Sequence, residues 1–123
     1  MKLLLTIAIT LLLAVQAMSY EVHILRPEGE ISLDEWRELI AANDKLEAIE
    51  ELSSKNPATG EVITIQMPNS AKLQLEMKDA VLYLRFSRGQ LHAKIQEEAD
   101  IEALKPIAKE LKAVIEGDEG ERY

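Results

Sequence analysis

The sequence predicts an α+β domain, in which an antiparallel or mixed sheet of four to five strands carries two helices on one face. Three observations support this class. Several short segments alternate apolar and polar residues, which is typical of half-buried strands. Two segments carry apolar residues at helical spacing, and clusters of turn residues separate the segments. The predicted order is strand, helix, four strands and helix, with a closing strand as an optional last element.

The first strand is predicted at residues 20–25, where β-branched and polar residues alternate, and residues 26–30 form a turn. Ser32 is a predicted helix N-cap, and Glu35 completes a capping box three residues later. Near-helical apolar spacing predicts that this helix continues to about Leu52.

Residues 43–44, Asn-Asp, are a point at which this predicted helix can divide into two helical segments. Residues 53–60 are rich in Ser, Asn, Pro and Gly and predict a loop. Residues 61–67 alternate again, with Ile63, Ile65 and Met67 on one face, so they form the second predicted strand. Pro68-Asn69-Ser70 predicts a turn before the next alternating segment at 73–77.

Residues 81–86 and 91–95 predict a hairpin around Ser87-Arg88-Gly89-Gln90, with Gly89 where a positive φ is needed. Alternation turns Leu82, Leu84 and Phe86 toward the core.

Asp100 is a predicted cap for a last helix that runs to about Lys112. Pro106 removes one helical hydrogen bond, so we expect either a kink there or a helix that starts near it. Residues 113–115 are the optional closing strand, and residues 117–123 form a short polar tail.

The first seventeen residues predict a cleaved signal peptide: a single Lys, a short apolar run and small residues before the cleavage site. Residues 18–123 are then one domain, exported to the periplasm. Two alternatives stay open at this point. The run can be a short uncleaved anchor, or it can precede a cytoplasmic protein that begins at Met18.

The chain is acidic, with 14 Lys and Arg against 22 Asp and Glu and a net charge of −8. Removing residues 1–17 takes away one Lys, so the remaining 106 residues have a net charge of 13 − 22 = −9. This charge argues against nucleic acid and anionic lipid as partners and favours a cationic protein. No cysteine is present, which excludes disulfides and thiolate metal sites.

The predicted open face of the sheet gathers Tyr83, Arg85, His92 and Lys94, with His23 on a neighbouring strand. The leading hypothesis is a non-enzymatic protein that binds another protein and attracts it through its acidic first helix or its acidic tail. The open face is a further candidate binding surface. The candidate partner-binding residues are Asp34, Glu35, Glu38, Glu47, Glu50, Glu51, Tyr83, Arg85 and His92.

The sequence shows no catalytic signature and implies no cofactor. The two histidines have no HxH or HxxxH spacing, and no acid lies beside them in a ligand pattern, so we expect no metal site. The alternative from another class is an envelope protein that binds a small ligand or a metal through His23, His92, Tyr83 and Arg85.

Three segments resemble a family of small acidic, mostly uncharacterised bacterial proteins: Ile31-Ser32-Leu33-Asp34-Glu35-Trp36, the hairpin 85–94, and the ending 111–123 with its Gly-Asp-Glu-Gly-Glu-Arg-Tyr. Some members resemble immunity proteins of secreted antibacterial toxins, so the resemblance implies a toxin as the cationic partner. It implies no catalytic residue. Two differences from the family are fewer Trp residues in the centre and Lys112 at a position where a Gly commonly ends the helix.

Overall fold

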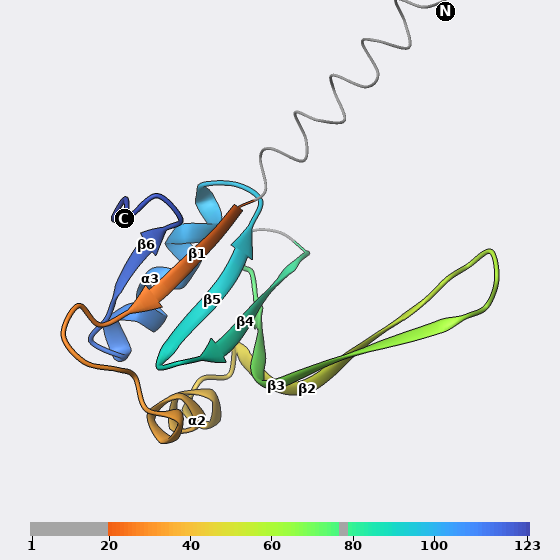
Figure 1. The fold of residues 1–123 in the computed structure, drawn as a ribbon, viewed down its shortest axis with the longest axis horizontal. Helices are drawn as coiled ribbons and strands as arrows, with labels where there is room; N and C mark the ends of the chain where they lie inside the picture. The colour runs from red at the N-terminus through yellow and green to blue at the C-terminus, as the bar shows by residue number, and fades with distance from the viewer. Residues whose placement is uncertain (1–19, 77–78) are drawn as a thin grey trace, which may run out of the picture.

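The computed structural model describes residues 20–76 and 79–123, which form a six-stranded antiparallel sheet and two helices (Figure 1). The elements are β1 (Tyr20–Leu25), α2 (Leu33–Ala42), β2 (Leu46–Lys55), β3 (Val62–Gln74), β4 (Val81–Ser87), β5 (Gln90–Ile95), α3 (Ala99–Glu110) and β6 (Val114–Gly117). The strand order is β2-β3-β4-β5-β1-β6. The α+β class is therefore confirmed, but the predicted four to five strands are too few.

The main error concerns residues 46–52, which we expected to continue the first helix but which belong to strand β2. Helix α2 begins at the predicted capping box of Ser32 and Glu35, but it ends at Ala42. Asn43 does interrupt the helix, yet the next segment is strand β2 and pairs with β3. The spacing of Leu46, Ile49 and Leu52 imitates a helix because a register irregularity between Ile49 and Glu51 disturbs the alternation of the strand.

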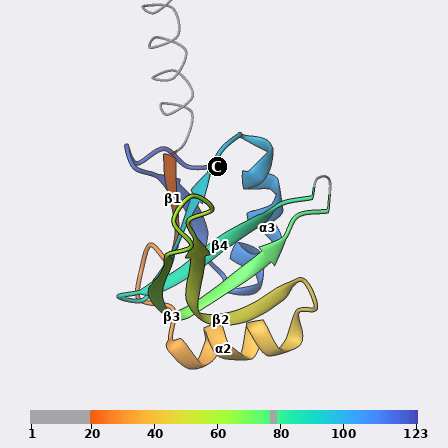
Figure 2. The ribbon, with the colours of Figure 1, turned by 90° about the vertical axis from the view of Figure 1, so that its right-hand side faces the viewer.

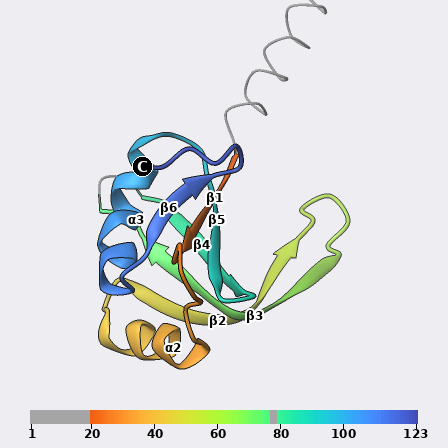
Figure 3. The same cartoon turned by 60° about the vertical axis from the view of Figure 1, so that its left-hand side comes forward.

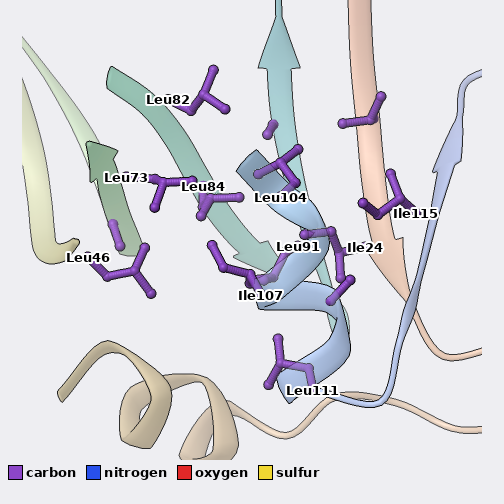
Figure 4. Close-up of a cluster of buried hydrophobic side chains, with 14 of the residues drawn as sticks. Ile24, Leu46, Leu73, Leu82, Leu84, Leu91, Leu104, Ile107, Leu111 and Ile115 are labelled. Atoms are coloured by element: carbon purple, nitrogen blue, oxygen red, sulfur yellow. The ribbon is translucent and has the colours of Figure 1, made fainter. Parts of the chain in front are cut away.

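The core lies on one face of the sheet, which α3 covers (Figure 4). Leu84, Leu91 and Ile115 from the strands pack against Leu104 and Ile107 from α3. Alternation places Leu82 and Leu84 in this core as predicted, and the half-buried Phe86 packs against it. Both helices contribute to the same core, because Trp36 of α2 is also part of this cluster.

The β4–β5 hairpin has the predicted sharp turn. Arg88 and Gly89 both have positive φ, 53° and 75°, and Ser87 pairs with Gln90 across them. Two successive positive φ angles are typical of a type I′ turn. Gly89 meets this requirement without steric strain, as the sequence predicted.

Helix α3 runs through Pro106, so the expectation that it starts near that residue is wrong. Asp100 does not act as its N-cap: its carboxylate accepts the backbone N–H groups of Gln96 and Glu97 in the preceding turn. After α3, Lys112 has φ 53°, the left-handed conformation that usually favours Gly at a helix end.

The closing strand is present as β6, and the polar tail folds back on it. Gly117 N–H donates to the carbonyl of Glu121, and Tyr123 N–H donates to the carbonyl of Ile115. The phenol oxygen of Tyr123 lies 3.0 Å from that of Tyr20 on β1, and this hydrogen bond raises the pKa of Tyr123. The tail thus brings Asp118 next to β1.

Strands β2 and β3 extend well beyond the rest of the sheet as a two-stranded arm (Figures 1 and 3). We define the arm as residues 51–66, which pair only between β2 and β3 among the described strands, since β3 reaches β4 only through Ser70–Gln74. A tight loop over residues 56–61 closes the tip, with Asn56 N–H donating to the carbonyl of Glu61. The predicted loop at 53–60 overlaps this tip, but it begins too early, because residues 53–55 belong to strand β2.

The base of the arm is fixed by α2, which lies beneath β2 and β3 in Figure 2. We expected Pro68-Asn69-Ser70 to turn the chain, but this segment lies inside β3 and bends it. Asn69 has φ 59° there. The indole Nε1 of Trp36 donates to the Asn69 carbonyl at 2.9 Å, and Arg37 donates to the Asn69 side chain at 3.2 Å. These contacts set the angle at which the arm leaves the sheet.

Within residues 20–76 and 79–123, neither helix has the length and apolar character needed to cross a bilayer. The signal-peptide prediction for residues 1–17 lies outside the described residues.

Candidate functional site

The face of the sheet opposite the core carries a polar row across four strands. In register from β4 to β6, Arg85 pairs with His92, His92 with His23, and His23 with Glu116. Alternation of side chains along the strands turns this row away from the core. The predicted open face therefore brings Arg85, His92 and His23 together.

This open face is hollowed between the sheet and the base of the arm. The hollow has a volume of about 400 Å³ and is lined by Tyr83, Arg85, His92 and Lys94 from this face; it also reaches Leu75, Leu82 and Asp100. Met67, from the base of the arm, lines it as well. Since Met67 continues the alternation of Ile63 and Ile65, the apolar face of the arm is continuous with the hollow.

The two histidines contact each other directly. Their Nδ1 atoms are 2.8 Å apart, and their rings cross at 77° with centroids 5.0 Å apart. Glu21 Oε1 lies 3.8 Å from His23 Nδ1 and 3.9 Å from His92 Nδ1. Arg85 is also close, with its Nη2 atom 3.7 Å from the same carboxylate oxygen.

The outer nitrogens of both rings have acceptors. His23 Nε2 lies 2.8 Å from Asp118 Oδ1, and His92 Nε2 makes a longer contact of 3.4 Å with the Ser87 carbonyl oxygen. Burial lowers the pKa of His92, and the charges of His23 and Arg85 lower it further, although the Ser87 carbonyl and Glu21 act in the opposite direction. The neutral imidazole is thus the favoured form of His92.

The expectation that no acid lies beside the histidines is wrong. Glu21 is two residues before His23 on β1, so both side chains are on the same face of the strand. That spacing was visible in the sequence. Asp118 could not be found in this way, because the tail reaches β1 only after it folds back across β6.

The six predicted acidic residues do not form one helical surface. Asp34, Glu35 and Glu38 are on α2, whereas Glu47, Glu50 and Glu51 are on β2 at the edge of the sheet. Glu47 pairs with Lys72 at 3.4 Å, and Glu51 accepts a hydrogen bond from Gln66 across the arm at 3.2 Å.

Glu35 has a structural role. Its carboxylate accepts two hydrogen bonds from Arg26, at 3.1 and 2.5 Å, and a third from the Ser32 backbone. These bonds, the Arg26 one foremost, lower the pKa of Glu35 to about 2. These contacts also fix the position of its carboxylate at the start of α2.

The arm carries exposed apolar side chains, a feature that the sequence analysis did not predict. Ile63 is 56% exposed and Ile65 is 59% exposed, although both are large apolar residues. They lie on one face with Leu52, which pairs with Ile65. On the other face Ser53 and Thr64 pair through their hydroxyl groups at 3.0 Å. Val62 is also exposed, at 59%.

Comparisons with protein-family models, with curated proteins and with solved structures find no match to this chain. The arm and the open face are therefore the two surfaces from which a function can be inferred.

Proposed function

We propose that this protein is a non-enzymatic periplasmic protein that binds a cationic protein partner between its arm and the open face of its sheet. The observation that carries this proposal is the exposed apolar face of the arm, formed by Leu52, Ile63 and Ile65. A two-stranded ribbon is marginally stable by itself. Contiguous apolar side chains on a protein surface are typical of sites that another protein covers.

The shape of the surface suits a protein rather than a small molecule. The apolar face of the arm leads through Met67 into the hollow of about 400 Å³ on the open face. There Tyr83 and Arg85 offer an aromatic ring and a guanidinium, the side-chain types that most often anchor protein interfaces. Tyr83 is 37% exposed and therefore accessible to a partner.

Charge complementarity supports a basic partner. Residues 46–67 contain four acids and one Lys, a net charge of −3. Glu50 and Glu51 are exposed on β2 where the arm begins, and Glu51 lies beside Gln66 on the polar face, across the ribbon from Leu52 and Ile65. An acidic border around an apolar patch accelerates encounter with a cationic surface and rejects acidic competitors. A secreted toxin that is neutralised by an immunity protein is the concrete partner we propose, on the resemblance of residues 31–36 and 111–123.

Reversing the charges of Glu50 and Glu51 tests whether these acids attract a basic partner. We expect Glu50→Lys with Glu51→Lys to reduce partner capture from periplasmic extract at least about tenfold at low salt, because two border charges change sign. Raising the ionic strength should weaken capture by the wild-type protein, since salt screens exposed charges. The measurement is quantitative pull-down over a series of salt concentrations.

The matched control reverses two exposed acids away from the arm, Glu110→Lys with Glu119→Lys. This variant has the same net charge but should capture the partner as the wild type does. Equal loss in both variants would show that net charge alone governs capture and would remove the arm from the account.

A further inference from the structure

We propose that Glu21, His23 and His92 bind one divalent transition-metal ion of the zinc type on the open face of the sheet. This site stands on observations independent of the arm. It differs from the main sequence-based expectation of no metal site, and it adds Glu21 to the metal-binding alternative, which named His23 and His92.

The hydrogen bonds of the two histidines leave a place for a cation. Asp118 Oδ1 and the Ser87 carbonyl can only accept, so the tautomers that satisfy both acceptors place hydrogens on Nε2 of His23 and of His92. In a neutral imidazole the other nitrogen then has a lone pair. Two Nδ1 lone pairs therefore face each other at 2.8 Å, beside a carboxylate. A cation between them turns this arrangement from repulsive to attractive.

The distances fit a metal ion. Three ligand atoms, Nδ1 of His23, Nδ1 of His92 and Oε1 of Glu21, form a triangle with sides of 2.8, 3.8 and 3.9 Å. The point equidistant from all three lies inside the triangle and is about 2.1 Å from each atom, which is the usual Zn–N and Zn–O distance. Among the described residues, these three are the group that could hold a metal ion.

Residues around the triangle tune the site. Asp118 orients His23 through Nε2, as carboxylates commonly do for metal-binding histidines. Arg85 holds the Glu21 carboxylate at 3.7 Å and brings a positive charge near the ion, which lowers the affinity. Two imidazoles and one carboxylate favour Zn²⁺ and similar ions over Mg²⁺ or Ca²⁺, which prefer all-oxygen sites.

The test uses tag-free protein, because the chain has only these two histidines and no cysteine. We expect Zn²⁺ to bind in 1:1 stoichiometry, to shift the ring ¹⁵N signals of both histidines and to raise Tm by at least about 5 °C. Mg²⁺ should produce none of these three effects. His23→Ala and His92→Ala should each weaken Zn²⁺ binding roughly 100-fold or more, and Asp118→Asn about 10- to 100-fold.

The wild-type signals decide the question even where a variant folds poorly. Unchanged Tm and unchanged histidine signals at millimolar Zn²⁺ would overturn the proposal and leave a shared proton as the cation between the rings. Lys94→Gln, on the same face but outside the triangle, is the matched control and should retain Zn²⁺ binding. An equal loss in this variant would also overturn the assignment.

Discussion

Trp36→Ala is expected to lower the free energy of unfolding by about 3–5 kcal/mol, the usual range for truncating a buried aromatic residue. Trp36 is 0% exposed, and its indole N–H satisfies the Asn69 carbonyl at the bend of β3. The substitution removes core packing and the anchor of the arm together. Domains of this size have about 5–15 kcal/mol in total, so the loss should be visible in urea denaturation followed by circular dichroism.

Two controls separate packing from hydrogen bonding. Trp36→Phe keeps most of the buried volume but leaves the Asn69 carbonyl without its donor, so a smaller loss of about 1–3 kcal/mol is expected. Tyr83→Ala truncates an aromatic residue that is 37% exposed and should cost the least. If Trp36→Ala unfolds within 1 kcal/mol of the wild type, α2 does not anchor the arm.

Ile63→Ser combined with Ile65→Ser is expected to abolish partner capture while leaving the fold intact. Each side chain is more than half exposed, so its replacement removes little buried surface from the folded protein. Covering both side chains in an interface contributes on the order of 1–2 kcal/mol each, which corresponds to about a 100-fold loss of affinity. Pull-down from periplasmic extract measures this loss, and thermal unfolding checks the fold.

The opposite face of the same strands supplies the control. Ser53→Ala with Thr64→Ala removes a hydroxyl pair from the polar face of the arm and should leave capture within about twofold of the wild type. Capture that survives the two isoleucine substitutions would move the binding surface away from the arm.

Local signals predicted much of the fold. The capping box at Ser32 and Glu35, the positive φ at Gly89 and the alternation of Leu82 and Leu84 all depend on neighbours in sequence, and all are confirmed. Strand β2 was missed because it depends on pairing with another strand. Its pairing partner is β3 and its alternation is broken at Ile49, so tertiary pairing overrides a pattern that looks helical.

The candidate site also has one part that local sequence predicts and another part that depends on the tertiary fold. Alternation placed Tyr83, Arg85 and His92 on one open face, which the structure confirms. The contact of Asp118 with His23 depends on a tail that folds back over β6. The exposure of Ile63 and Ile65 depends on where β4 stops pairing with β3. Neither the Asp118–His23 contact nor the exposure of the two isoleucines can be predicted from the local sequence.

Site-specific photo-crosslinking from the arm tests the protein-binding account most directly. A benzophenone amino acid at position 65 lies on the apolar face, and the same group at position 64 lies on the polar face of the same strand. We expect position 65, and not position 64, to crosslink to a basic protein of different sequence, with a yield that falls as salt is raised. Equal crosslinking from both positions, crosslinking only to a second copy of this chain, or none from position 65 would contradict the account.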